Sequence, residues 1–122
     1  MTALYELVLL EDTGHDLATV RIRNKKPGPE NPAVEWMTAF NQEDLRADLE
    51  EASPDFKVAV AAANFAEMLR GSPYAADLKW PELVELAAQS QRPGVPEDDE
   101  LLSLIQRAAS LSNTRGPTAG RQ

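Results

Sequence analysis

The chain has 122 residues, of which 43% are hydrophobic and 26% charged, a composition typical of one globular domain with a single core. Twenty acidic residues against twelve basic ones give a net charge of −8, which argues against nucleic acid as a partner because phosphate binding requires clustered Lys and Arg. The absence of cysteine excludes disulfides, thiolate metal sites and thiol catalysis, and no run approaches the roughly 18 apolar residues of a membrane span.

The first two apolar runs predict an N-terminal β-hairpin. Residues 3–10 are largely apolar on both faces, whereas residues 17–23 alternate, with Ala18, Val20 and Ile22 on one face. After a proline-rich loop over residues 24–33, residues 34–38 can add a short third strand with Val34 and Trp36 on one face. A sheet this small has uncovered edges and faces, so we expect its strands to contact something else.

The stretch from residue 53 to 71 predicts a buried central helix over residues 54–70. Ser53 is a good N-cap, Pro54 suits the first helical position, and Gly71 can adopt the left-handed conformation that ends many helices. Between these caps the helix is apolar on nearly all sides, which predicts that it is buried. Its one polar exception, Asn64, is expected to bond to a neighbouring loop backbone, because an unpartnered buried amide is costly.

Shorter helices are expected on either side of this central helix. Asn41 and Asp44 are spaced as a capping box for a short helix that ends near Glu51, and Pro81 begins a helix over residues 81–90. The acidic residues 97–100 suit the first turn of a last helix, whose apolar stripe consists of Leu101, Leu104, Ile105, Ala108 and Leu111.

The order of these elements defines the predicted fold class. Because the strands come first and the helices afterwards, the sequence predicts an α+β domain over residues 1–112, with an N-terminal β-hairpin followed by a small helical bundle. Residues 113–122 have almost nothing to bury and are expected to form a disordered tail.

Two segments resemble the C-terminal region of bacterial von Willebrand factor type A domain proteins of the YfbK type. They are TALYELV at 2–8 with LATVRIRNKKPG at 17–28, and ASPDFKVAVAAANFAEMLRGSPY at 52–74, and the resemblance continues through residues 80–87 and 101–111. It implies that the chain is a fragment of a longer protein, exported or anchored in the cell envelope, whose strands join a β-sandwich beside a metal-binding A domain. The Asp-x-Ser-x-Ser signature of that metal site does not occur here, so no metal role carries over to any residue.

The candidate catalytic residues centre on the only histidine. His15 lies in a predicted turn with Asp12 and Asp16, and the alternative function is a small hydrolase or metal-dependent enzyme that uses His15 with these acids. Glu11 with the same two aspartates lacks the ligand spacing of a known calcium loop. A solvated polar turn explains all four residues.

The favoured function is a non-enzymatic interaction or structural module that accompanies a von Willebrand factor type A domain. The resemblance implies that its partners are that A domain and the β-sandwich of the same parent protein, and we expect the isolated chain to self-associate through the exposed hairpin. No cofactor, catalytic residue, metal ligand, nucleic acid or membrane span is expected. The predicted interaction surface consists of Leu4, Tyr5, Leu7, Val8, Val20, Ile22, Trp36 and Trp80.

Overall fold

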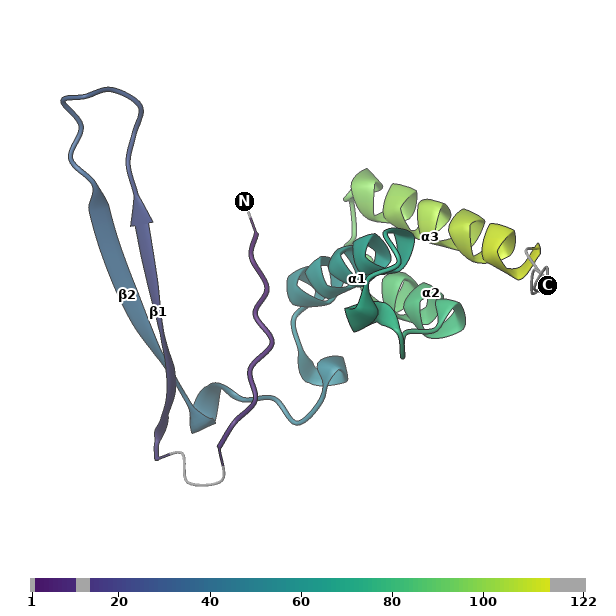
Figure 1. Ribbon diagram of the computed structural model, residues 1–122, viewed down its shortest axis with the longest axis horizontal. Helices are drawn as coiled ribbons and strands as arrows, with labels where there is room; N and C mark the ends of the chain where they lie inside the picture. The colour runs from purple at the N-terminus through teal and green to yellow at the C-terminus, as the bar shows by residue number, and fades with distance from the viewer. Residues whose placement is uncertain (1, 11–13, 115–122) are drawn as a thin grey trace, which may run out of the picture. The chain divides into compact units, whose positions relative to one another are not determined.

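The computed structural model describes residues 2–10 and 14–114 (Figure 1). Two antiparallel strands, β1 (Asp16–Asn24) and β2 (Val34–Asn41), come first. The helices follow in the order η1 (Gln42–Asp44), η2 (Leu49–Glu51), α1 (Pro54–Leu69), η3 (Pro73–Ala75), α2 (Trp80–Gln89) and α3 (Pro96–Thr114), where η denotes a 3₁₀ turn. The predicted α+β class, with an N-terminal hairpin ahead of a helical bundle, is confirmed.

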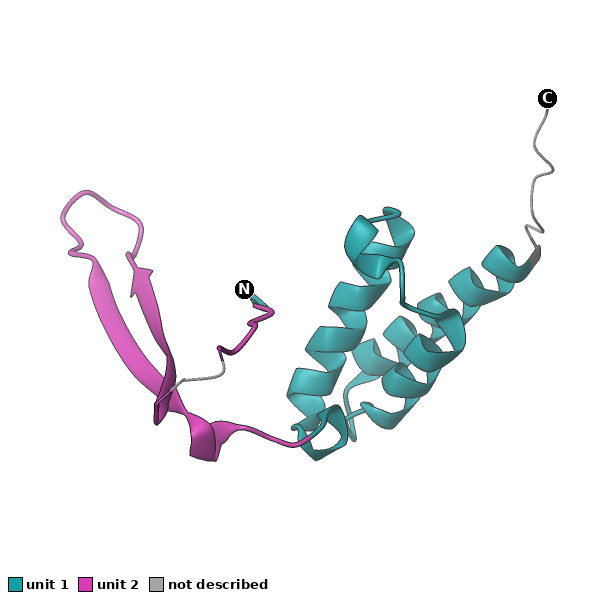
Figure 2. Cartoon of the chain, turned by 60° about the horizontal axis from the view of Figure 1, so that its bottom comes forward, with its two compact units in different colours: residues 1–4, 48–122 teal, residues 5–47 magenta. Residues whose placement is uncertain are grey.

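The chain divides into two compact units (Figure 2). The strand unit comprises residues 5–47, and the helical unit comprises residues 1–4 together with 48–122. The sequence predicted one domain over residues 1–112. That prediction requires the two units to pack together as one domain, and it stays a prediction. Helix α3 extends to Thr114, and residues 115–122, which hold most of the predicted tail, lie outside the described residues.

The hairpin pairs different segments from those that the sequence pattern suggested. Residues 2–10 contain no strand, and β1 pairs instead with β2, which runs beyond the expected residues 34–38 to Asn41. The register places Ala18 opposite Phe40, Val20 opposite Thr38 and Ile22 opposite Trp36. An apolar run favours a strand but does not specify which neighbouring run pairs with it, so the pattern located β1 correctly and its partner incorrectly.

Both predicted ends of α1 are confirmed. Ser53 Oγ accepts a hydrogen bond from the Phe56 N–H at 3.2 Å, and Pro54 occupies the first turn. At the other end Gly71 has φ +64°, and the N–H of Ser72 donates to the Glu67 carbonyl at 3.0 Å. These contacts form a Schellman ending, which satisfies carbonyl groups that the last turn would otherwise leave unpaired.

The core of the helical unit is small and lies around α2. It consists of Ala61, Leu83, Ala87 and Ile105, and α2 packs against both α1 and α3, which contact each other far less. The sequence predicted that α1 is covered on nearly all sides, whereas the structure buries its Ala61 side and leaves Phe56 and Leu69 exposed. Within the helical unit α1 packs mainly against α2, which covers one side of it.

The expected short helix after Asn41 is replaced by two separate 3₁₀ turns. The capping box is present, because Asn41 Oδ1 accepts from the Glu43 N–H and Asp44 Oδ2 accepts from the Asn41 N–H, both at 2.9 Å. The box nevertheless closes a single turn, η1, and Leu45 after it is 44% exposed. A longer helix here would bury too little apolar surface to offset the entropy of ordering it.

Candidate interaction surface

The β1–β2 ribbon has one face without charge. Residues that pair across antiparallel strands project to the same face, so the register determines both faces of the ribbon. We define the apolar face by the residues Ala18, Val20, Ile22, Val34, Trp36 and Phe40. The remaining positions on that face, Asn24 and Thr38, are neutral.

The large side chains of the apolar face are open to water. Val20, Ile22, Val34, Trp36 and Phe40 are between 37% and 57% exposed. A two-stranded ribbon by itself is marginally stable in water, and contiguous exposed apolar side chains usually mark a surface that binds something. The ribbon is therefore the candidate interaction surface among the described residues.

The opposite face of the ribbon is polar. It carries Thr19, Arg21 and Arg23 from β1, and Arg23 lies directly opposite Glu35 of β2. Arg21 lies opposite Met37, whose side chain is 67% exposed. This face suits contact with water, so the two faces of the ribbon differ in character as those of a half-buried sheet do.

The predicted surface residues at the N-terminus lie on an extended segment. Leu4 belongs to the helical unit and is 40% exposed, whereas Tyr5, Leu7 and Val8 belong to the strand unit and are 84%, 59% and 89% exposed. No strand or helix includes them. Of the eight residues of the predicted interaction surface, Val20, Ile22 and Trp36 thus lie together on the apolar face of the ribbon.

Trp80 occupies a different environment from the ribbon residues. It is half-buried at the start of α2, and its ring meets that of Phe65 edge-to-face, with 6.3 Å between centroids and an interplanar angle of 75°. A partner contact for Trp80 stays a prediction. Sequence reasoning missed Phe40, although the alternation that placed Val34 and Trp36 on one face would have included it in a longer strand.

His15 does not form a recognisable site with the described residues around it. Its side chain is exposed, and its backbone carbonyl accepts from the Gln42 N–H at 3.2 Å. Asp16 begins β1, and Asp12 lies outside the described residues. Within residues 2–10 and 14–114, no group of three His, Asp or Glu side chains is placed to bind a metal ion.

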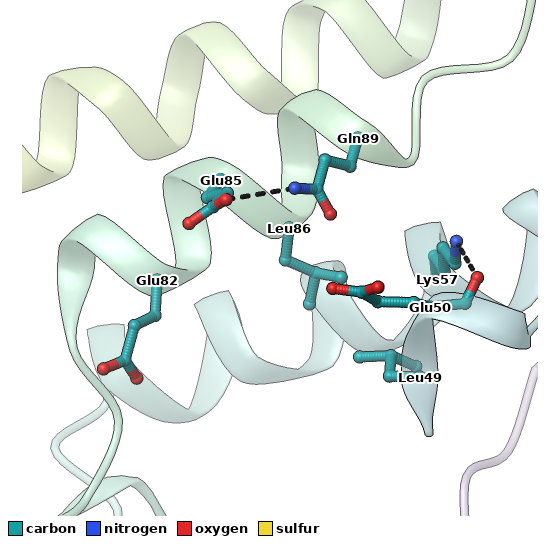
Figure 3. A pocket seen from close by; sticks show the side chains of 7 residues that line it. All are labelled: Leu49, Glu50, Lys57, Glu82, Glu85, Leu86 and Gln89. Carbon is teal, nitrogen blue, oxygen red and sulfur yellow. Dashed lines mark hydrogen bonds between the residues drawn. The ribbon is translucent and has the colours of Figure 1, made fainter. Parts of the chain in front are cut away.

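A hollow of about 200 Å³ lies in the helical unit beside α1, α2 and η2 (Figure 3). Lys57 Nζ donates to the Glu50 carbonyl at 2.7 Å, and Gln89 Nε2 donates to Glu85 Oε1 at 3.1 Å. The hollow is lined by Leu49, Glu50, Lys57, Glu82, Glu85, Leu86 and Gln89. This lining contains no hydroxyl, thiol or imidazole, so the hollow lacks a Ser, Thr or Cys nucleophile with a histidine base.

Asn64 lines an adjoining hollow of about 230 Å³ together with Leu49, Leu78, Leu83 and Leu86. Its side chain is half-buried, and among the described residues its amide forms no hydrogen bond to a loop backbone. The expected loop contact is therefore wrong. Partial exposure explains this, because an amide that reaches water does not need a protein partner.

The most connected polar group is Arg92, in the loop between α2 and α3. Its guanidinium group donates to Asp98 and to Asp55, and the Asp98 side chain is only 4% exposed. The hydrogen bond from Arg92 holds the pKa of Asp98 below its usual range, and hydrogen bonds to Asp98 and Asp55 raise the pKa of Arg92. Both groups are charged at neutral pH, so this cluster stabilises structure and is not poised for proton transfer.

Comparison with known proteins places most of the chain in one family. The family model that matches is described as "Uncharacterized protein YfbK, C-terminal", and it covers residues 5–111. No curated protein and no solved structure matches the chain. No helix among the described residues has both the length and the apolar character that a bilayer crossing requires.

Proposed function

Because this chain belongs to the YfbK C-terminal family, we propose that it is a non-enzymatic module that docks beside a von Willebrand factor type A domain of the same parent protein. The observation that carries this proposal is the apolar face of the ribbon, which holds five large side chains at 37–57% exposure and no charge. The family description, which refers to the C-terminal part of a longer protein, supports a partner within the same polypeptide.

The ribbon favours another β-sheet as the surface that it contacts. Two sheets pack face to face about 10 Å apart when each has an apolar inner face and a hydrated outer face. The ribbon has this division, with Ile22 and Trp36 on the inner side and Arg21 and Arg23 on the outer side. Its open edges also allow main-chain pairing with a partner strand.

The polar groups of the described residues support a module over an enzyme. The Arg92 cluster joins the first turns of α1 and α3, and the hollow near Glu85 is lined by no hydroxyl, thiol or imidazole group. His15 is exposed on a loop that contacts Gln42 through the backbone. Location in the cell envelope follows from the family resemblance and is part of the proposal, and fractionation of cells that express the tagged parent protein tests it.

A binding measurement tests the proposed function. The A domain of a YfbK-type protein, purified with its preceding strands, is titrated with this chain in a calorimeter. The variants Ile22→Thr and Trp36→Ser alter the apolar face, and we expect each to weaken binding roughly tenfold or more, because buried aromatic and aliphatic anchors dominate interface energies.

The matched controls alter the polar face of the same two strands. Thr19→Ala and Met37→Ser leave the apolar face intact, so we expect affinity within a few-fold of the unaltered chain. Equal losses from both faces, or no binding by the unaltered chain, would contradict the proposed function. Circular dichroism of every variant shows whether the helical unit is retained.

A further inference from the structure

The segment formed by residues 5–9, here called the donor segment, has the sequence of a strand but not its pairing. Tyr5, Leu7 and Leu9 alternate with Glu6 and Val8, and all five side chains are exposed. The structure places no strand or helix in this segment. Glu6 is the one polar residue of the five, so both faces of the segment are largely apolar, which is typical of a strand that lacks its sheet.

The ribbon has a free edge that fits such a strand. The sheet consists of β1 and β2 only, so within the described residues the outer edge of β1 has no partner strand. An open edge presents unpaired backbone N–H and C=O groups, which an additional strand satisfies. The strand unit therefore offers both a donor segment and an acceptor edge.

We propose that two copies of this chain exchange donor segments, so that residues 5–9 of each copy pair along the free edge of β1 in the other. This inference goes beyond the proposed function, because it gives the apolar face of the ribbon a second partner, which competes with the A domain for it. The position of Glu6 agrees with the two faces of the ribbon, and Val8 lies on the same side as Glu6. When Tyr5, Leu7 and Leu9 extend the apolar face, Glu6 falls on the polar face that carries Arg21 and Arg23. The only acid of the segment then meets two cations, a favourable cross-strand arrangement.

A second copy of the chain covers the apolar face, which a donor segment paired at the edge of β1 leaves exposed to water. Pairing of the segment with its own ribbon would satisfy an edge but leave the apolar face in water. A twofold arrangement also stacks the two apolar faces, and it brings no like charges together because those faces carry none.

The exposed area approaches that of a standard interface. Three side chains of the donor segment extend the apolar face, Tyr5, Leu7 and Leu9, and they are 45–84% exposed, while five of the apolar face itself are 37–57% exposed. At roughly 150–200 Å² for each fully exposed side chain, they offer on the order of 700 Å² per copy, against roughly 800 Å² per partner in a standard interface.

A charge-exchange experiment with the full chain tests the pairing. Glu6→Arg places a cation opposite Arg21 of the other copy, and Arg21→Glu places an acid opposite Glu6. We expect sedimentation equilibrium to show a dimer for the unaltered chain and roughly tenfold weaker association for each variant alone. An equimolar mixture of the two variants restores opposite charges at both junctions, so its association should return to that of the unaltered chain.

Several outcomes decide the inference. Restoration on mixing supports exchange between copies, since pairing within one chain cannot be repaired by a second chain. A strictly monomeric unaltered chain overturns it, as does concentration-independent protection of the residue 5–9 amides from hydrogen exchange. Replacing both Leu7 and Val8 by proline should abolish the dimer, because one of any two neighbouring N–H groups in the strand faces β1 and proline removes it, whereas Ala3→Pro, outside the donor segment, should not.

The inference and the proposed function can fail separately. If the chain is monomeric but still binds the A domain through Trp36, only the strand exchange is contradicted. If the chain is a dimer but does not bind the A domain at any concentration, only the proposed function is contradicted.

Discussion

The guanidinium group of Arg92 donates two hydrogen bonds to the carboxylate of Asp98, from Nε to Oδ2 at 2.8 Å and from Nη2 to Oδ1 at 2.6 Å. The backbone N–H of Arg92 also donates to Oδ2 at 2.9 Å, and Nη1 reaches Asp55 Oδ1 at 2.7 Å. Asp55 lies in the first turn of α1 and Asp98 in the first turn of α3. One side chain from the α2–α3 loop therefore ties together the beginnings of two helices.

Replacing Arg92 should lower the thermal stability of the helical unit. Arg92→Ala leaves the 4% exposed carboxylate of Asp98 without its charged partner, which is more damaging than losing an exposed ion pair. Arg92→Lys should recover only part of the loss, since an ammonium group cannot form the two-pronged contact. Thermal unfolding followed by circular dichroism measures both effects.

The control for Arg92 is the exposed ion pair between Lys79 and Glu82, at 3.1 Å. Lys79→Ala should cost less than about 1 kcal/mol, because water screens such a pair. A melting temperature that falls equally in the Arg92 and Lys79 variants would show that the Arg92 cluster has no special role.

The pH dependence of stability should include a contribution from Asp98. Its pKa in the folded chain lies below its unfolded value of about 3.9, so the unfolded state binds the proton first as the solution is acidified. The stabilisation is fully present above that unfolded value and is lost as the pH falls toward the lower folded value. Urea unfolding between pH 7 and pH 2, for the unaltered chain and Asp98→Asn, measures this contribution.

Asp98→Asn should be less stable at neutral pH and should lose less stability on acidification. Asp77→Asn, at an exposed aspartate outside the cluster, provides the control and should follow the unaltered chain. If the curves of Asp98→Asn and the unaltered chain differ by a constant amount across the whole range, the carboxylate does not titrate as proposed.

Ile105 should be a principal contributor to the stability of the helical core. Its side chain is 0% exposed, and truncation to alanine leaves a cavity that typically costs about 2–5 kcal/mol. Leu111→Ala, on the same helix at 69% exposure, should change the free energy of unfolding by less than about 0.5 kcal/mol. Chemical denaturation of both variants compares the two positions, and similar losses would contradict the assigned core.

Ala61 and Ala62, neighbours on α1, should respond differently to a larger side chain. Ala61 is 0% exposed against the helical core, so Ala61→Leu should destabilise the unit by about 1–3 kcal/mol through overpacking. Ala62 is exposed, and Ala62→Leu should be close to neutral in the same denaturation assay. A neutral Ala61→Leu would mean that the core has unfilled space beside α1.

Local signals in the sequence predicted the helix ends well, because each is decided within a few residues. Ser53, Pro54 and Gly71 act as expected, and the capping box of Asn41 and Asp44 forms even though its helix does not. Part of the apolar face was predictable from local sequence as well. The alternation of apolar and polar residues along each strand is enough to place Val20, Ile22 and Trp36 on that face.

The sequence by itself determined where this chain turns, where its main helices begin and which side of β1 is apolar, because these features depend on steric and capping interactions between near neighbours. Only the tertiary structure decided that β1 pairs with β2 instead of residues 3–10, that α2 packs between α1 and α3, and that Arg92 joins Asp55 to Asp98. These arrangements depend on contacts between residues far apart in the chain, where many pairings satisfy the same local pattern and the whole fold selects one of them.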